Sequence, residues 1–501
     1  MIANLRNALR HNSSLCHLQP CRSATAIAQT SSNILHQSKS LQDAFSTACI
    51  SNTRILSSIT TTNTTNRYYG VYAWGQSKNG TLPLPTVVDE EGLLIESQTP
   101  SEGDKAVAQP ASKGLVLSSG SDRVQVFDTP AEMDVGKAFG AEKEIAQYIC
   151  SPLSSSSAVI FNDGSCAVWG DNSNGKLGLP NQTDTKFVTT PTKFQVPTVM
   201  EDEVNSMKGN NDDNMATKEI GFRTIRLGSR FSAAVTTAGD LFTYGFGGSV
   251  LDGMGMLGHG DGESYTTPKR VESLIEDGCA VDDVAVSDLH MTVLTTEGEV
   301  LTTGSGSYGR LGNLESADQL FLEPVELLGG MNTLQVVGGH AFSLVLTDDG
   351  MIHGWGRNDK GQLGTGGGMM VDMYAMNELP TPIEGYLENN KVVKIAAGHS
   401  HAAAITESGE LYTWGSNQHL EPQLMTQLLH TKCVDVKCGM DYTVILDHFG
   451  QLYSFGQGKK TGVLGQASTK SVSVATLVEG MTHRTAVSIS AGMSHFACLV
   501  E

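Results

Sequence analysis

The stretch SLVLTDDGMIHGWGRNDKGQLG, from Ser343 to Gly364, carries the pattern that decides the fold. An apolar run leads into a short acidic turn that ends in glycine, a second apolar run closes on Trp-Gly, and a polar loop ends in Leu-Gly. Two β-favouring runs on either side of such a turn are typical of a β-hairpin. The terminal glycine supplies the positive φ that the turn needs. The stretch therefore predicts a hairpin followed by a loop, and it contains no catalytic motif.

The same hairpin pattern of 15 residues recurs without a gap along the chain. A constant spacing indicates a repeat architecture in which every copy is one small structural unit. No copy shows helical periodicity, and repeating all-β units joined by glycine turns predict a β-propeller. The six copies are Ser156–Gly170, Phe231–Gly245, His290–Gly304, Phe342–Gly356, His401–Gly415 and Tyr442–Gly456.

Two further positions recur around each hairpin. A glycine three residues ahead of it allows a tight turn from a preceding strand, as at Gly228, Gly339, Gly398, Gly439 and Gly492. An aromatic residue usually closes it, as at Trp74, Trp169, Tyr244, Trp355, Trp414 and Phe455. A buried indole normally donates its N–H to a partner. We therefore interpret the closing aromatics as packing between units and not as ligand-stacking residues.

The two ends of the sequence each carry half of a unit. VSISAGMSHFACLVE, at 487–501, has the leading glycine and a first hairpin strand but no second strand. YYGVYAWGQSKNGTL, at 68–82, has a second strand and its loop but no first strand. Joining the halves completes a seventh unit and leaves no exposed sheet edge at the ends. The sequence predicts an all-β, seven-bladed β-propeller closed by pairing the N- and C-terminal strands in one blade.

These motifs resemble the repeat of the regulator of chromosome condensation family. The shared pattern is Gly-x-x-[His/aromatic], a hairpin to Trp-Gly, and then Asn-x-x-Gly-x-Leu-Gly, and it covers residues 68–501. A WD-repeat propeller would need a Gly-His and Trp-Asp rhythm that the sequence lacks. The resemblance implies a seven-bladed propeller. The stretch YGFGGSVLDGMGMLGHG, at 244–260, is similar to that of mitochondrial members and adds five residues to its loop.

The composition divides the chain into 1–66 and 67–501. Residues 1–67 hold six basic residues and one acid, so the remainder has 27 basic and 52 acidic residues and a net charge of −25. We expect the propeller over 67–501, with polar insertions near 86–140 and 185–218 that form surface loops. The unit after Trp414 lacks the Gly-x-Leu-Gly element, so its blade is expected to be the least regular.

The first residues, MIANLRNALRHNSSL, predict a targeting segment. They place Ile2, Leu5 and Leu9 on one side of a helix and Arg6 and Arg10 on another. An acid-poor, Arg-bearing, Ser-rich amphipathic start is typical of an organelle presequence. We expect a mitochondrial location, in the matrix or at the matrix face of the inner membrane, with a plastid as the less favoured alternative. No apolar run is long enough to span a bilayer.

Candidate functional residues are those that differ between repeats in loops on one face. They are Asp252, Met254, Met256 and His259 in the added loop, with Arg310 and Arg357 in neighbouring loops. An Arg beside apolar Met residues in a loop is a plausible protein-binding spot. At the first hairpin position His290, His401 and His495 alternate with aromatic residues, which indicates packing and not catalysis. We predict no catalytic site, no cofactor and no metal site.

Two functions remain open. The resemblance implies a non-catalytic mitochondrial scaffold that supports respiratory complex assembly or the maturation of mitochondrial RNA or ribosomes through protein contacts. The alternative is guanine-nucleotide exchange on a small GTPase, as the founding member performs on Ran, with the added loop as a wedge. A net charge of −20 favours protein partners over RNA.

Overall fold

The computed structural model places the described residues in the unit Tyr68–Glu501. It describes residues 70–78, 82, 115–119, 122–134, 138–140, 143–197, 220–366, 374–387, 389–458 and 460–501. The predicted targeting segment over 1–66 lies outside these residues.

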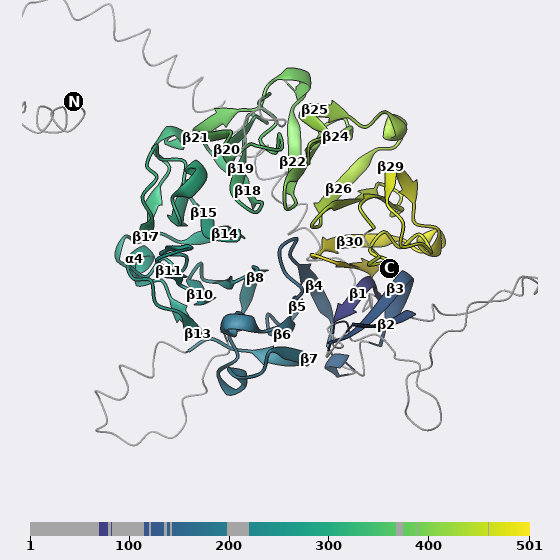
Figure 1. Cartoon of the computed structure of the whole chain (residues 1–501), viewed down its shortest axis with the longest axis horizontal. Coiled ribbons are helices and arrows are strands. Elements are labelled where there is room, and N and C mark those ends of the chain that lie inside the picture. Colours follow the sequence, from purple (N-terminus) through teal and green to yellow (C-terminus); the bar gives the residue numbers. More distant parts are fainter. Residues whose placement is uncertain are drawn as a thin grey trace, which may run out of the picture. The chain divides into compact units, whose positions relative to one another are not determined.

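Seven antiparallel sheets stand in a ring, as Figure 1 shows. Six of them are four-stranded meanders in chain order. Blade 1 holds β4 (Ile145–Cys150), β5 (Ser157–Phe161), β6 (Cys166–Asp171) and β7 (Phe187–Phe194). Blade 2 holds β8 (Phe222–Leu227), β9 (Phe231–Thr236), β10 (Leu241–Gly245) and β13 (Tyr265–Arg270). Blade 3 holds β14 (Val281–Val286), β15 (His290–Thr295), β16 (Val300–Gly304) and β17 (Gln319–Pro324).

Blades 4 to 6 repeat this layout. Blade 4 holds β18 (Thr333–Gly338), β19 (Phe342–Thr347), β20 (Ile352–Arg357) and β21 (Met376–Pro382). Blade 5 holds β22 (Val392–Ala397), β23 (His401–Thr406), β24 (Leu411–Gly415) and β25 (His419–Leu424). Blade 6 holds β26 (Cys433–Cys438), β27 (Tyr442–Asp447), β28 (Leu452–Gly456) and β29 (Val472–Leu477). The first strands of successive blades contact one another around the ring, from β4 through β30 and back to β4.

Blade 7 joins the two ends of the propeller. Its strands are β30 (Ala486–Ala491), β31 (His495–Val500), β1 (Gly70–Lys78), β3 (Asp122–Met133) and β2 (Leu115–Ser119). Strands β1 and β31 pair in antiparallel register from Gly70 opposite Val500 to Gly75 opposite His495. The rings of Trp74 and Phe496 lie 4.5 Å apart and are fully buried. The predicted seven-bladed ring, closed by its two end strands, is confirmed.

The leading glycines are required by close packing as well as by the turn. At Gly439 the backbone N–H donates to the carbonyl of Tyr442 at 2.8 Å, which is the predicted tight turn. The Tyr442 ring then lies directly over the glycine, where an added Cβ would come within 1.9 Å of it. Any side chain would displace the ring, so the aromatic or His position and the glycine three residues before it are needed together.

Hydrogen bonds between blades use the two repeated positions. The indole N–H of Trp74 donates to the carbonyl of Val463 at 2.8 Å, in the loop of the preceding blade. Trp355 and Trp414 make the equivalent bonds at 2.9 and 3.0 Å. The histidines point the other way, because His495 Nε2 lies 3.0 Å from the hydroxyl of Ser157 in the following blade. These bonds agree with the prediction that both positions serve packing.

Parts of the two predicted insertions form strands. Within 86–140 the structure forms strand β3, which pairs with β1 and buries Val126, Phe127 and Met133. Within 185–218 it forms β7, the outer strand of blade 1. Both strands lie toward the outside of the ring and bury only part of their residues, so their sequences look like polar loops. Residues 86–114 and 198–218 lie outside the described residues.

Blade 5 is not the least regular, contrary to the expectation. It has four strands, and β24 pairs with β25 with the register shift at Gly415 that the other blades show at their equivalent glycines. Ser416 and Asn417 adopt positive φ values of 52° and 58° and turn the chain at once. A left-handed turn of two residues therefore replaces the longer loop without loss of the outer strand.

We predict that Phe496→Ala lowers the free energy of unfolding by about 3–5 kcal/mol, because it removes a buried ring from the closing blade. Urea unfolding monitored by circular dichroism measures the change. Phe449→Ala is the control, since that side chain is 70% exposed and its loss should change little. Equal effects of the two variants would contradict the closing role of Phe496.

We also predict that stability falls as the pH is lowered from about 6.5 to 4. Burial lowers the pKa of His495 to about 4, so the unfolded chain takes up this proton first and is favoured as the pH falls. One such group contributes a slope of at most about 1.4 kcal/mol per pH unit. Urea unfolding at several pH values should show a smaller slope for His495→Phe, because Phe231 and Phe342 occupy this position elsewhere. An unchanged slope would show that His495 does not titrate this way.

Candidate functional site

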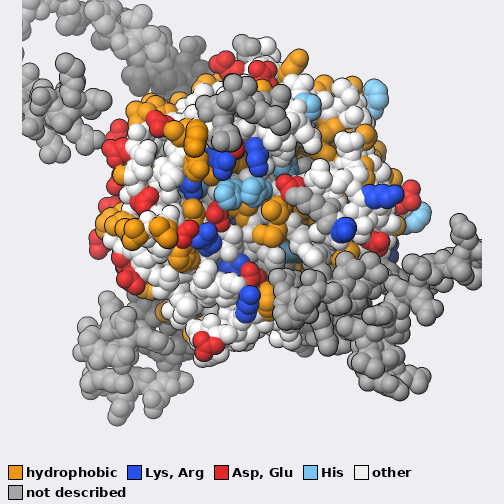
Figure 2. All heavy atoms as spheres, in the orientation of Figure 1, with side chains coloured by type: hydrophobic (Ala, Val, Ile, Leu, Met, Phe, Trp, Pro, Cys, Tyr) orange, Lys and Arg blue, Asp and Glu red, His pale blue; other side chains and the backbone are white. Residues whose placement is uncertain are grey.

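The strand order gives the ring two chemically different faces. Because successive strands of a meander run in opposite directions, the loops joining strands one to two and three to four of each blade share one face, named here the loop face. The hairpin turns and the connections between blades share the other, named the turn face. In Figure 2, His, Lys and Arg side chains gather near the middle of the face in view.

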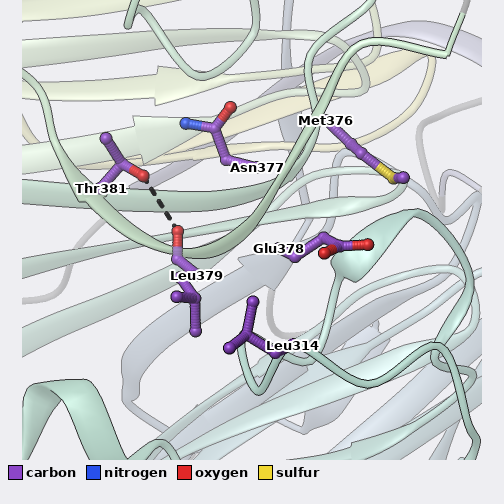
Figure 3. A pocket seen from close by; sticks show the side chains of 6 residues that line it. All are labelled: Leu314, Met376, Asn377, Glu378, Leu379 and Thr381. Carbon is purple, nitrogen blue, oxygen red and sulfur yellow. Dashed lines mark hydrogen bonds between the residues drawn. The ribbon is translucent and has the colours of Figure 1, made fainter.

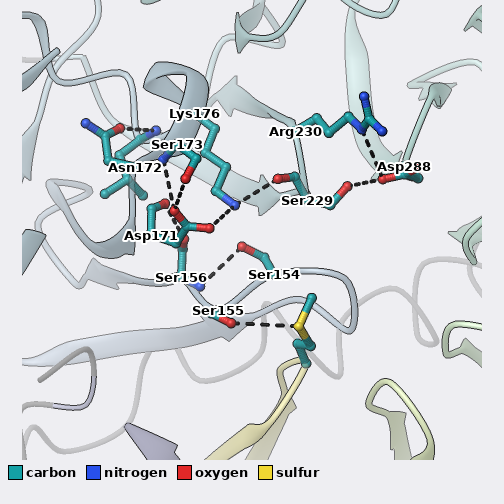
Figure 4. Close-up of polar contacts among 12 residues, drawn as sticks. Ser154, Ser155, Ser156, Asp171, Asn172, Ser173, Lys176, Ser229, Arg230 and Asp288 are labelled. Carbon is teal, nitrogen blue, oxygen red and sulfur yellow. Dashed lines mark hydrogen bonds and ion pairs between the residues drawn. The ribbon is translucent and has the colours of Figure 1, made fainter. Parts of the chain in front are cut away.

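A chain of polar contacts, named here the Asp288 network, runs across the loop face. Lys176 Nζ of blade 1 lies 2.9 Å from Asp171 Oδ2 and donates to the carbonyl of Ser229 in blade 2 at 2.8 Å. The Ser229 hydroxyl donates to Asp288 of blade 3, and Arg230 Nε lies 3.7 Å from the same carboxylate. Figure 4 shows these residues reaching one another from separate blades.

The network continues into blades 4 to 6. His340 Nε2 lies 3.4 Å from Asp288 Oδ2. The His340 ring stacks on the ring of His399 with 4.6 Å between centroids. The backbone N–H of His399 then donates to the carbonyl of Met440 at 3.2 Å. The network thus links loops of blades 1 to 6 around the middle of the ring.

Asp288 is held as an anion at the centre of this network. Its burial alone would raise the pKa of the carboxyl group. The hydrogen bonds from His340 and Ser229 and the charge of Arg230 outweigh burial and lower the pKa to about 2. A carboxylate with three partners and such a low pKa is a poor general base near neutral pH. Its arrangement fits a fixed negative charge that orients its neighbours.

A small hairpin projects from the loop face beside the network. It consists of β11 (Gly248–Ser249) and β12 (Gly253–Met254), and its tip is Val250-Leu251-Asp252. Val250 and Leu251 are 92% and 97% exposed. Large aliphatic side chains so fully in water have no packing role in the ring itself.

The hairpin is fixed from several sides, at its tip and at its base. Asp252 accepts a hydrogen bond from the Ser249 hydroxyl at 2.8 Å and lies 3.1 Å from Arg230 Nη1. The Met254 N–H donates to Asp318 of blade 3 at 2.9 Å. The hairpin is therefore tied both to the Asp288 network, through Arg230, and to the neighbouring blade. It holds an apolar tip in a defined place.

Arg310 is a buried cation. Its side chain and that of Arg357 both approach the Tyr308 ring, with guanidinium carbons 5.6 and 4.9 Å from the centroid. Arg310 is 3% exposed, and its Nε donates to the carbonyl of Ser307 while Nη1 has no partner. Burial lowers its pKa to about 10. Among the described residues no carboxylate forms an ion pair with it.

The structure separates the six residues that the sequence selected. Asp252 belongs to the network, Met254 is 37% exposed at the hairpin base, and the Arg357 side chain is partly accessible beside Asp359 at 2.7 Å. Met256 is fully buried in the blade core, so its selection as a partner-binding residue is wrong. It stands directly before the buried Leu257, and packing explains it.

His259 also serves the fold. Its Nε2 lies 2.9 Å from the Thr243 hydroxyl, and its ring meets the Tyr265 ring edge-on at 5.2 Å. Burial, with a smaller effect of the nearby Lys269, lowers its pKa to about 4. These contacts give His259 a role in packing the loop, and its selection as a partner-binding residue stays a prediction.

Sequence reasoning missed Asp288, His340 and His399. Each stands two residues before the first position of its hairpin, where the repeats show no common residue type; His340 and His399 follow a leading glycine and Asp288 follows Ser287. The sequence signal that could have identified these residues is the variation in residue type at this one repeat position. Val250 and Leu251 were also passed over, although they are the two aliphatic residues at the centre of the added loop.

Other features of the described residues do not add a site. A shallow depression on the outer strand of blade 4 contains an internal bond from the Thr381 hydroxyl to the Leu379 carbonyl and no member of the network (Figure 3). It is lined by Leu314, Met376, Asn377, Glu378, Leu379 and Thr381. In the same part of the chain, no group of three or more His, Cys, Asp or Glu side chains is placed to hold a metal ion.

None of the helices in the described ranges has the length and apolar character needed to cross a bilayer.

Comparison with known proteins gives consistent matches. The model of the RCC1-like domain matches residues 70–424. Human E3 ubiquitin-protein ligase HERC2 is 32% identical over 295 residues, which span 56% of this chain but only 5% of HERC2. The mitochondrial RCC1 domain-containing protein RUG3 of Arabidopsis thaliana is 28% identical over 371 residues, 68% of this chain and 73% of RUG3. The structure of Prp20p from Saccharomyces cerevisiae superposes with a TM-score of 0.64 at 16% identity, covering 87% and 92% of the two chains.

Lys176 and Arg310 offer a matched test of the loop face, because both precede Leu-Gly in their repeats and both are buried. Lys176 has Asp171 as a partner, so Lys176→Met should lower the free energy of unfolding by about 3 kcal/mol. Arg310→Met should leave it unchanged or raise it, because a buried charge without a counter-ion is lost. Thermal and urea unfolding of both variants measure the difference. If Arg310→Met lowered the free energy of unfolding as much as Lys176→Met, Arg310 would be shown to stabilise the fold.

Proposed function

The chain belongs to the family of RCC1-like domains, and on this premise we propose that it is a non-catalytic mitochondrial scaffold. In this proposal it holds protein partners against its loop face while respiratory complexes, or the mitochondrial ribosome and its RNA, are assembled or matured. The observation that carries the proposal is the tip of the β11–β12 hairpin, where Val250 and Leu251 are 92% and 97% exposed.

The hairpin has the features of a binding anchor. Apolar side chains held by a rigid base gain more on burial against a partner than mobile ones, because little ordering is left to do. The surroundings are charged, since Asp252 in the tip lies 3.1 Å from Arg230, which in turn lies 3.7 Å from Asp288. An apolar centre with a polar rim is the usual anatomy of a protein–protein interface.

The partner is proposed to be a protein and not RNA. The region after residue 67 has a net charge of −25, which repels a phosphate backbone. On the loop face the cations are largely engaged, as Lys176 is with Asp171 and Arg357 with Asp359. Arg310 is 3% exposed and therefore offers little charge to a phosphate backbone.

The mitochondrial location rests on two supports. RUG3, which is named as a mitochondrial protein, matches 68% of this chain. The sequence of residues 1–67 has six basic residues and one acid and an amphipathic start. This composition is typical of the presequences that direct import into the organelle.

Guanine-nucleotide exchange on a small GTPase is the second candidate. The hairpin favours it, because a fixed projection beside a charged network could press on the nucleotide site of a GTPase. Prp20p, which shares the fold, is described with binding to Gsp1p and histones, and this is a property of that protein. The acidic balance and the basic N-terminal segment favour the organelle scaffold as the first candidate.

Proximity labelling of the full-length chain in intact cells tests the proposal. We expect the wild type to label respiratory or ribosomal assembly components of the mitochondrion. The Val250→Ser/Leu251→Ser variant should lose about 90% of that labelling, since anchors at the centre of an interface contribute most of the affinity. Val474→Ser is the control, because Val474 is 45% exposed on the outer strand of blade 6, away from the hairpin.

The outcomes separate the candidates. Equal labelling by wild type and hairpin variant would contradict a loop-face scaffold. Labelling of a small GTPase, together with hairpin-dependent acceleration of its nucleotide release, would support the second candidate instead.

A further inference from the structure

The first strand of every blade has a bulge at its second residue. In β22, Val392 pairs with Thr406 and Lys394 with Ile405, so Val393 is an extra residue with no partner on β23. The same register shift occurs in the first strands of all seven blades. A bulge turns its extra side chain away from the ladder. These side chains stand where the first strands begin, at the turn-face end of the ring centre.

In four consecutive blades this bulged residue is a large exposed aliphatic. We name Leu334, Val393, Val434 and Val487 the aliphatic crescent, and they are 56%, 50%, 43% and 41% exposed. They belong to β18, β22, β26 and β30, which are successive first strands in contact around the ring. The side chains are therefore neighbours on one arc and not scattered single residues.

The fold does not require aliphatic residues at this position. The three other blades have Ala146, Arg223 and Asp282 at the same bulge, and Arg223 and Asp282 form an ion pair with each other. These polar and small residues support the same strand pairing. The bulge therefore does not explain why four successive blades have exposed aliphatic side chains at this position. Such a contiguous apolar patch marks a binding surface.

The charged residues around the crescent indicate which class of partner it fits. The hairpin turns of blades 3 to 5 place exposed Glu297, Asp348, Asp349 and Glu407 on the same face. Lys391 and Lys432 also stand on this face at the starts of two first strands, but the hairpin turns between strands two and three contain no Lys or Arg. The hairpin turns of blades 3 to 5 are therefore acidic and complement a basic partner.

We propose that the aliphatic crescent binds a basic amphipathic segment of a partner protein, with apolar side chains on the crescent and Lys or Arg toward the acidic turns. A second copy of this chain fits less well, because a two-fold contact would bring the same acidic turns together. A membrane surface fits less well, because anionic headgroups are repelled by these acids. The site lies on the face opposite the hairpin, so the ring can hold two partners at once.

The test uses the purified full-length chain and a fluorescent synthetic helix of about four turns, with leucines on one side and lysines on the other. Fluorescence anisotropy should show saturable binding that weakens with added salt. The Val393→Ala/Val434→Ala variant should bind about tenfold more weakly. It is expected to fold, because Ala146 occupies this position in blade 1. Val474→Ala is the matched control, since Val474 is 45% exposed on an outer strand, and it should bind like the wild type.

Several results would overturn the proposal. These are no binding, equal binding of a peptide with the same residues in scrambled order, or equal weakening by Val474→Ala. Self-association of the wild type that Val393→Ala/Val434→Ala abolishes would assign the crescent to a second copy. Crescent-dependent binding to vesicles that contain an anionic lipid would assign it to a membrane surface. None of these results depends on the β11–β12 hairpin. They therefore do not affect the proposal that the loop face binds a partner, which the labelling experiment tests separately.

Discussion

The pairing of β1 with β31 is the constraint on which the rest of the structure depends. It joins strands more than 400 residues apart in the sequence and turns an open array into a ring. In an open array the first and last blades would each expose a sheet edge, and the first strands would have no fixed common centre. In the ring, indole bonds reach back to the preceding blade, and histidine bonds reach forward to the next.

Ring closure brings the variable repeat positions of different blades together. Positions that hold the blades together recur in most units, such as the leading glycines and the closing aromatic at Trp74. Positions that face the ring centre are free to differ, and there the chain places Asp288 and His340 on one face and the aliphatic crescent on the other. Lys176 and Arg310 show the same freedom, because one repeat position holds a paired cation in blade 1 and an unpaired one in blade 3.

The sequence was sufficient for the hairpins and for the closure, because both depend on local turn chemistry and on two half-units that complete each other. It was not sufficient for the Asp288 network, whose members come from separate blades and meet only through the ring. Strands β3 and β7 were taken for insertions, since strands that bury only part of their residues have polar sequences that resemble loops. Met256 was misjudged because neighbours in one Gly-rich loop alternate between core and surface within two residues.

Hydrogen exchange of the full-length chain, followed by mass spectrometry across a urea series, tests ring closure most directly. We expect peptides covering β1 and β31 to exchange only with global unfolding, together with the second strands of blades 2 to 6. Both closing strands would then belong to the same cooperative unit as the rest of the ring. Exchange of β1 and β31 at urea concentrations that leave the other blades protected would show that the other blades stay folded when β1 and β31 separate. The fold would then not depend on ring closure.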